Sequence, residues 1–135
     1  MSAQVLADTH SLIWYLFEPA RLSQLACAAF DDTIAAGFPI LVSAISLVEI
    51  QYLQEKNRIV PGTLDAIRET CSCESPNLEI APVDERIAYQ LQQIARGTVP
   101  DMPDRIIAAT AMALNVPLVT RDEKIRASGV SIIVA

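Results

Sequence analysis

Glycine is scarce in this sequence, and the phosphate-binding loops that depend on it are missing. Four glycines occur among 135 residues. None of them forms the G-x-G-x-x-G or G-x-x-x-x-G-K spacing in which backbone amides surround nucleotide phosphates. Binding of a dinucleotide or a nucleoside triphosphate by either route is therefore disfavoured.

Cysteine and histidine are also rare, which argues against a zinc site or a nucleophilic triad. Cys27, Cys71 and Cys73 form an odd set, and no further Cys or His near Cys71 and Cys73 completes a zinc pattern. We interpret them as free thiols in a reducing cytosol and expect a cytoplasmic protein. The single histidine, His10, lacks partners for a triad or a zinc site. It is interpreted as a partly buried residue of the first helix in preference to a catalytic group.

Membrane-spanning segments and an export signal are not evident in the sequence. The longest uncharged runs, 33–48 and 106–120, each contain proline and are shorter than the roughly 18 to 20 residues that a membrane span needs. No positively charged leader precedes an apolar segment and a cleavage site, so we expect no export and no membrane partner. The 52% hydrophobic content and mean hydropathy of +0.34 are ample for one domain, 1–135, with a sizeable core.

The excess of acidic residues is uneven along the chain. A net charge of −6 and a pI near 4.6 argue against holding nucleic acid by overall electrostatic attraction. Between residues 96 and 126, however, five basic residues accompany four acids, and the local charge turns positive if some of those acids bind a cation. A phosphodiester substrate therefore remains compatible with the sequence. These residues are Arg96, Arg105, Arg121, Lys124 and Arg126, with Asp101, Asp104, Asp122 and Glu123.

Short apolar runs alternate with longer helical patterns, which predicts an α/β fold with a mainly parallel sheet covered on both faces. Ligands of such sheets bind beyond the carboxyl ends of the strands, where the strand order reverses. The expected strands are 4–7, 39–42, 78–81, 116–120 and 130–134. The expected helices are 11–17, 23–36, 46–56, 64–73, 85–96, 104–114 and 123–127.

Four acids are predicted to reach this one edge of the sheet, although each also has an ordinary structural explanation. Asp8 follows the first strand and could be a turn residue. Glu49 lies one turn into a helix and could form a capping box with Ser46. Asp104 begins a buried helix, and Asp122 follows a strand and could cap the next helix; favourable helix-terminus interactions would explain both.

Taken together, the four acids indicate a cation. Two carboxylates about 4 Å apart repel each other by roughly 1 kcal/mol in water and about 4 kcal/mol at an effective dielectric near 20. An all-oxygen ligand set suits a hard ion such as Mg²⁺ or Mn²⁺, which keeps waters and takes one or two direct carboxylates. Coordination positions then remain for a phosphate oxygen and a nucleophilic water.

Four segments resemble, in order and spacing, the acidic motifs of the PIN-domain family, and in particular of the VapC-type ribonuclease toxins. They are Val5-Leu-Ala-Asp8-Thr-His, Ser43-Ala-Ile-Ser-Leu-Val-Glu49, Asp101-Met-Pro-Asp104-Arg-Ile-Ile-Ala-Ala-Thr-Ala and Leu118-Val-Thr-Arg-Asp122. The resemblance covers essentially the whole chain and implies a three-layer α/β/α sandwich. It also implies Mg²⁺- or Mn²⁺-dependent cleavage of RNA, a cognate antitoxin and a homodimer.

The resemblance also assigns roles to the acids. It implies that Asp8 and Asp104 are the principal metal ligands and that Glu49 and Asp122 complete the acidic site. The family often has Asp-Pro-Phe-Asp-Arg where this chain has Asp101-Met-Pro-Asp104-Arg105, and the displaced proline leaves the exact start of the helix, and with it the role of Asp101, open. Because Asp is a frequent N-cap, Asp101 is interpreted as a cap and Asp104 as the ligand.

Other roles and functions stay open from the sequence. Arg105 or Arg121 could contact phosphate. Trp14, Tyr15 and Phe17 are expected in the core, although an exposed part of this cluster could belong to a protein interface. The main alternative function is a PIN-like scaffold that mainly binds a protein partner and has little or no activity. A phospho-acceptor receiver domain fits less well, because it would have paired acids after the first strand.

Overall fold

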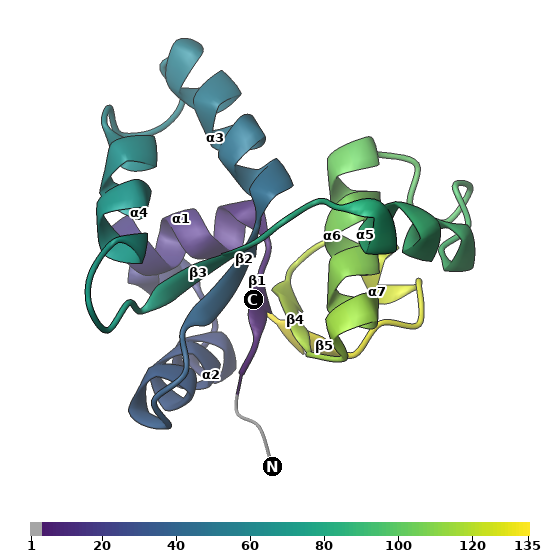
Figure 1. Cartoon of the computed structure of the whole chain (residues 1–135), viewed down its shortest axis with the longest axis horizontal. Coiled ribbons are helices and arrows are strands. Elements are labelled where there is room, and N and C mark those ends of the chain that lie inside the picture. Colours follow the sequence, from purple (N-terminus) through teal and green to yellow (C-terminus); the bar gives the residue numbers. More distant parts are fainter. Residues whose placement is uncertain (1–3) are drawn as a thin grey trace.

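The computed structural model describes residues 4–135, which form a central sheet with helices on both faces (Figure 1). The strands are β1 (Leu6–Ala7), β2 (Ile40–Ser43), β3 (Leu78–Ala81), β4 (Leu118–Thr120) and β5 (Ile132–Val134). The α-helices are α1 (Thr9–Phe17), α2 (Gln24–Ala35), α3 (Ala44–Glu55), α4 (Thr63–Cys71), α5 (Glu85–Gln90), α6 (Met102–Leu114) and α7 (Glu123–Arg126). Two short 3₁₀ helices are η1 (Pro19–Arg21) and η2 (Leu91–Gln93).

The five strands are all parallel and follow the order β3-β2-β1-β4-β5. The strand β1 lies at the centre, where Leu6 is in register with Leu41 on one side and with Leu118 on the other. The chain first builds outward from β1 to β3 and then returns to β4 and β5 on the opposite side. The strand order therefore reverses between β1 and β4, which is where ligands of such sheets bind.

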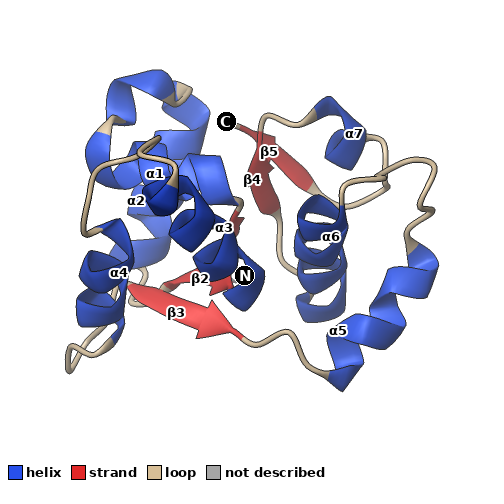
Figure 2. Cartoon of the chain, turned by 90° about the horizontal axis from the view of Figure 1, so that it is seen from above, coloured by secondary structure: helices blue, strands red, loops and turns tan. Residues whose placement is uncertain are grey.

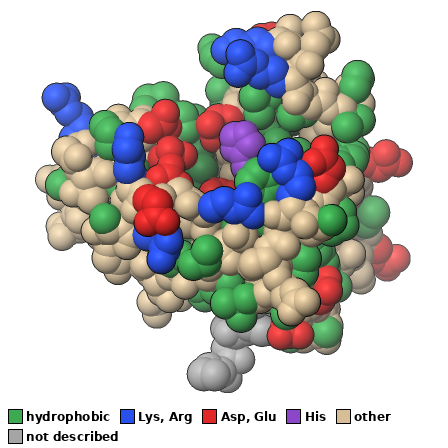
Figure 3. All heavy atoms as spheres, turned by 180° about the vertical axis from the view of Figure 1, so that it is seen from behind, with side chains coloured by type: hydrophobic (Ala, Val, Ile, Leu, Met, Phe, Trp, Pro, Cys, Tyr) green, Lys and Arg blue, Asp and Glu red, His purple; other side chains and the backbone are tan. Residues whose placement is uncertain are grey.

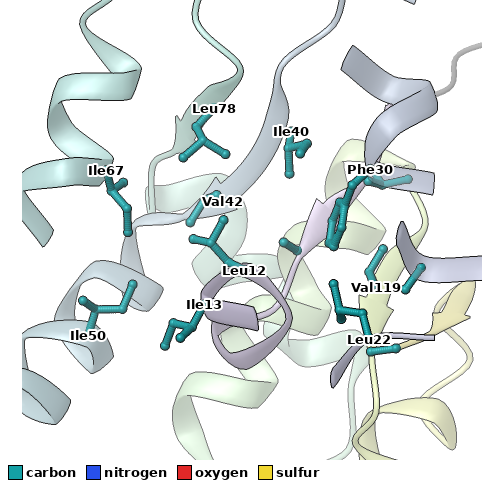
Figure 4. Packing of buried hydrophobic residues seen from close by; sticks show 14 residues of the cluster. Leu12, Ile13, Leu22, Phe30, Ile40, Val42, Ile50, Ile67, Leu78 and Val119 are labelled. Atoms are coloured by element: carbon teal, nitrogen blue, oxygen red, sulfur yellow. The ribbon is translucent and has the colours of Figure 1, made fainter. Parts of the chain in front are cut away.

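Successive strand residues face opposite layers of helices, as the two-residue period of a strand requires. On one face, Val5, Val42 and Val119 join a core that includes residues of α1, α2, α3 and α4. Figure 4 shows this packing around Leu12, Ile13 and Phe30. On the other face, Leu6, Leu41 and Leu118 pack with α5, α6 and α7. These layers, seen from above in Figure 2, confirm the predicted α/β/α sandwich.

Two helices begin earlier than the sequence predicted, because a residue at the strand end supplies the cap. Asp8 caps α1, which starts at Thr9 and not at Ser11. Ser43, still within β2, caps α3 by accepting a hydrogen bond from the Ile45 amide at 3.2 Å. In both cases the chain turns directly from strand to helix, so residues of the first helical turn lie at the edge of the sheet.

The helix α6 matches the expected buried segment and starts at Met102, two residues before Asp104. All six residues from Ile106 to Ala111 are buried. Asp101 caps the helix by accepting a hydrogen bond from the Asp104 amide at 3.1 Å, and Asn115 ends it with a left-handed φ of 55°. None of the helices within residues 4–135 has the length and apolar character needed to cross a membrane.

Candidate metal-binding active site

Asp8 is held rigidly at the carboxyl end of the central strand. One carboxylate oxygen accepts the Ser11 amide at 2.9 Å, as an N-cap does, and the other accepts the hydroxyl of Thr120 from β4. Asp8 is therefore the turn residue that its position suggested, and its side chain also lies at the switch point of the sheet. Its orientation is fixed from two elements that are distant in sequence.

Glu49 is oriented by hydroxyl groups and does not form the capping box that the sequence suggested. Its Oε1 accepts a hydrogen bond from the Thr9 hydroxyl at 2.5 Å, and the same Thr9 oxygen lies 2.9 Å from the Ser46 hydroxyl. Because α3 is capped by Ser43, Ser46 lies inside the helix and is not its cap. Burial raises the pKa of Glu49, and the Thr9 hydrogen bond partly opposes that shift.

Asp104 lies in the first turn of α6 and has the most perturbed carboxyl group of the site. Its pKa is raised to about 8, first by burial, then by a hydrogen bond with Asp122 and by the negative charges of Asp101, Asp122 and Glu49. Without a cation, the cluster thus favours retention of a proton on Asp104. This is the electrostatic response expected when several carboxylates share one cavity.

Asp122 caps α7, and the side chain of Thr120 links it to Asp8. Its carboxylate accepts the Lys124 amide at 2.8 Å and the Ile125 amide at 3.4 Å. Its own amide donates to the Thr120 hydroxyl oxygen at 3.1 Å, while that hydroxyl donates to Asp8. The cap role proposed for Asp122 is thus present, and it does not remove the side chain from the cavity.

One cavity of about 470 Å³ is lined by all four predicted acids. Figure 3 shows acidic side chains gathered next to Lys and Arg side chains on one face of the molecule. The cavity brings together residues from the ends of β1 and β4, from the first turn of α6 and from α3. Its lining comprises Asp8, Thr9, His10, Trp14, Glu49, Asp101, Asp104, Arg121 and Asp122.

The donor set fits a hard divalent cation that keeps part of its water. Within residues 4–135, no three Asp, Glu, His or Cys side chains already converge as a closed coordination group. A fully protein-made cage is not needed for Mg²⁺, which commonly takes one or two carboxylates together with waters and substrate phosphates. The carboxylates of Asp8 and Asp104 can supply such ligands, and the charge of the remaining acids adds to the attraction for a cation.

Hydroxyl residues are the part of the site that sequence reasoning missed. Thr9, Ser46 and Thr120 are buried and hold Glu49, Asp8 and the Asp122 amide in place. Thr9 directly follows Asp8, and Thr120 lies two residues before Asp122, but a threonine at a strand end is too common to indicate such a role by itself.

Two predictions about aromatic and histidine residues were wrong. Phe17, the last residue of α1, is 38% exposed, whereas Trp14 and Tyr15 pack against the core as expected. His10 is exposed and not partly buried. It lies at the mouth of the acidic cavity, with its ring centroid 5.9 Å from that of Trp14.

The two candidate phosphate contacts differ in availability. Arg105 donates hydrogen bonds to the backbone carbonyls of Ile94 and Leu91, both at 2.9 Å, and so holds the segment before α6. Arg121 lines the acidic cavity and lies over the Trp14 ring, with 4.5 Å between its guanidinium carbon and the ring centroid. Arg121 also donates hydrogen bonds to backbone carbonyls, those of Ala135 and Arg21, so the two arginines differ in that only Arg121 lines the acidic cavity.

The fold and site define a class: a doubly wound parallel α/β protein whose acids meet at the switch point of the sheet. The sequence model of the PIN domain matches residues 5–129, and the chain belongs to the PIN-domain family. A curated relative, ribonuclease VapC22 of Mycobacterium tuberculosis, is 30% identical over 129 residues, which cover 90% of this chain and 89% of the relative.

Solved structures give the same fold assignment. VapBC2 from Rickettsia felis, bound to a DNA fragment from its promoter, aligns with a TM-score of 0.71 and 18% identity over 96% of this chain and 97% of that one. FitAcB from Neisseria gonorrhoeae aligns with a TM-score of 0.65 and 24% identity over 96% of each chain. A toxin–antitoxin complex from Klebsiella pneumoniae aligns with a TM-score of 0.63 and 23% identity, also over 96% of each chain.

Proposed function

We propose that this protein is a metal-dependent endoribonuclease toxin of the VapC type. The observation that carries the proposal is the meeting of Asp8, Glu49, Asp104 and Asp122 in one cavity at the switch point of the sheet. Membership of the PIN-domain family and the ribonuclease name of the mycobacterial relative support it. The substrate is RNA, and the cofactor is Mg²⁺ or Mn²⁺.

The four acids have different roles in the proposed reaction. Asp8 and Asp104 would hold the metal ion, and Asp104 would have to lose the proton that the metal-free cluster favours. The ion, when bound, acidifies a water and neutralises charge that develops at the scissile phosphate during an in-line displacement. Glu49 and Asp122 would ligate the ion directly or through water, or would accept the proton of the attacking water, and the hydroxyls of Thr9 and Thr120 orient Glu49 and Asp8.

The proposed partners follow from the same family membership. Structural neighbours of this chain include a toxin–antitoxin complex, which supports a cognate antitoxin as a protein partner in the cytoplasm. A homodimer is also proposed. Val48 and Tyr52 on α3 are 50% and 61% exposed, and they supply apolar surface that a second copy can cover.

The decisive experiment is RNA cleavage by an Asp104→Asn variant with Mg²⁺ or Mn²⁺. We expect activity to fall by at least about 100-fold, because a metal ligand and its charge are lost. The matched control is Asp84→Asn, which changes an N-cap of α5 whose carboxylate accepts the Ile87 amide at 3.3 Å and lies outside the acidic cavity. This control should retain activity.

Two outcomes would contradict the assignment. Full activity in a folded Asp104→Asn protein would remove Asp104 from the mechanism. Tight antitoxin binding by the unchanged protein, with no Mn²⁺ binding in calorimetry and no RNA cleavage, would instead favour the PIN-like scaffold without activity.

A further inference from the structure

A second cavity adjoins the acidic one and differs from it in charge. It has a volume of about 300 Å³ and lies between α1 and the segment that follows α3. His10 and Trp14 line both cavities, so the two lie next to each other. We call this second space the outer cavity; its apolar lining is Ile13, Trp14, Phe17, Leu53, Ile59 and Val60.

The charged lining of the outer cavity is mostly basic. Arg21 and Arg58 line it together with His10, and Glu18 is its single acid. Glu18 forms an ion pair with Arg21 at 3.3 Å, with both side chains 56% exposed, and such exposed pairs exchange readily for other partners. Arg58 is exposed, and among residues 4–135 its guanidinium has no hydrogen-bond or ion-pair partner.

Trp14 organises the basic groups at the border of the two cavities. The guanidinium carbons of Arg21 and Arg121 lie 4.7 and 4.5 Å from its ring centroid. Arg121 also donates hydrogen bonds to the carbonyls of Ala135 and Arg21. Arg21 and Arg121 are thus pre-positioned beside the acids by their contacts with Trp14.

The basic groups of the outer cavity can offset the repulsion between the acidic site and the phosphates of an RNA strand. An RNA strand is repelled by four carboxylates, and a bound divalent ion offsets that repulsion only at the phosphate it contacts. A neighbouring phosphate needs cations outside the acid cluster, and the outer cavity provides them beside the acidic cavity. Its apolar lining can receive the flat face of a base.

We propose that the outer cavity is a nucleotide subsite that binds the RNA residue next to the cleaved bond. Arg21 and Arg58 bind its phosphate, and the apolar lining receives its base. Because a base can enter only when it is unpaired, the subsite selects single-stranded RNA. The proposal rests on the proposed ribonuclease function and assigns to it a specificity site separate from the four acids. A volume of about 300 Å³ is at the lower limit of ligand pockets and suits a single base.

The test is RNA binding by full-length protein that carries Asp104→Asn, so that the probe stays intact. Fluorescence anisotropy is measured with fluorescein-labelled uridine dinucleotide and octanucleotide. Adding Arg58→Gln should weaken octanucleotide binding about tenfold, the usual effect of losing one charge-assisted contact. The dependence of log affinity on log salt should become shallower by about 0.7. Arg58→Lys should restore most of the affinity, since the positive charge remains.

The matched control is Lys56→Gln, which removes the same charge from the same loop at a residue that does not line the outer cavity. It should change binding of the octanucleotide by less than about twofold. Equal effects of Lys56→Gln and Arg58→Gln would overturn the proposal, because general attraction would then explain both. Equal affinity for single-stranded and duplex RNA, or for octanucleotide and dinucleotide, would also overturn it.

The two proposals fail in distinguishable ways. If the unchanged protein cleaves no RNA while Arg58→Gln still weakens octanucleotide binding, the ribonuclease function fails and the subsite stands. If cleavage is normal and Arg58→Gln leaves RNA binding unchanged, the subsite fails alone. Loss of antitoxin binding in Arg58→Gln, with RNA binding unchanged, would assign the outer cavity to a protein partner and contradict the RNA subsite.

Discussion

At the scale of single residues, Thr120 connects two of the four acids. Its buried hydroxyl donates to Asp8 and accepts from the Asp122 amide. Thr120→Val keeps the shape of the side chain and removes both hydrogen bonds. We expect RNA cleavage to fall by about tenfold or more, because Asp8 loses its fixed orientation. Unfolding in urea should show a loss of about 1–3 kcal/mol, since a buried polar group is left unpaired.

Thr110 provides the matched control for that variant. It is also fully buried, and its hydroxyl donates to the Ile106 carbonyl within α6, at 2.8 Å. Thr110→Val should alter stability by a similar or smaller amount and leave cleavage unchanged. If both variants lose activity in proportion to their loss of stability, Thr120 has only a structural role.

The residues of the site show what the sequence could and could not reveal at this scale. Asp8 and Asp122 could be placed because Asp8 directly follows one recognisable strand and Asp122 lies two residues after the end of another. The hydroxyls of Thr9 and Thr120 could not, because their bonds span 40 and 112 residues along the chain. Threonine is also common in strands, so the presence of a threonine at these positions does not by itself indicate such a role.

At the scale of elements, α6 was the easiest to predict and α3 the hardest. The uncharged run 106–114, between Arg105 and Asn115, marks the buried part of α6 and its C-terminal end, and the helix begins only two residues before its predicted start. In α3, two serines three residues apart offered two possible caps, and the pairing of Ser46 with Glu49 favoured the wrong one. The choice of Ser43 follows from its place at the end of β2, in register with Ala81 of β3. That register was not visible in the sequence.

The start of α6 provides a test that separates capping from metal binding. Asp101 accepts the Asp104 amide and is exposed. Asparagine caps helices about as well as aspartate, whereas alanine costs about 0.5–2 kcal/mol. We therefore expect Asp101→Asn to keep both stability and RNA cleavage, and Asp101→Ala to lose stability in urea unfolding. Loss of cleavage in Asp101→Asn, with stability unchanged, would mean that the Asp101 carboxylate takes part in the chemistry.

At the scale of the whole molecule, sheet topology explains why residues distant in sequence form one site. Alternating strands and helices were enough to predict a parallel sheet, but they did not determine the strand order. The order β3-β2-β1-β4-β5 places β1 beside β4, and this adjacency brings Asp8 to Asp122. The outer cavity depends in turn on the packing of α1 beside the segment after α3, for which the sequence pattern carries no information.

The concentration of negative charge at the switch point should also make the free energy of unfolding depend on pH. The pKa of Asp104 is about 8 in the folded, metal-free protein, against an ordinary value of 3.8. Between these values the folded state holds a proton that the unfolded state has lost. The free energy of unfolding should therefore decrease as the pH rises from about 4 to about 8. In Asp104→Asn this decrease should be smaller, because the titrating group is absent.

A divalent ion should reverse this loss, since it replaces the proton among the carboxylates. An ion at about 100 times its dissociation constant adds roughly 2.7 kcal/mol, a rise in Tm on the order of 5–10 °C for a chain of this size. We expect Mn²⁺ to raise Tm by this amount at pH 8 and much less at pH 5, where the ion must displace the Asp104 proton. Thermal unfolding with Mn²⁺ or EDTA measures both. An equal rise at the two pH values, or an equal rise in Asp104→Asn, would show that the ion binds elsewhere.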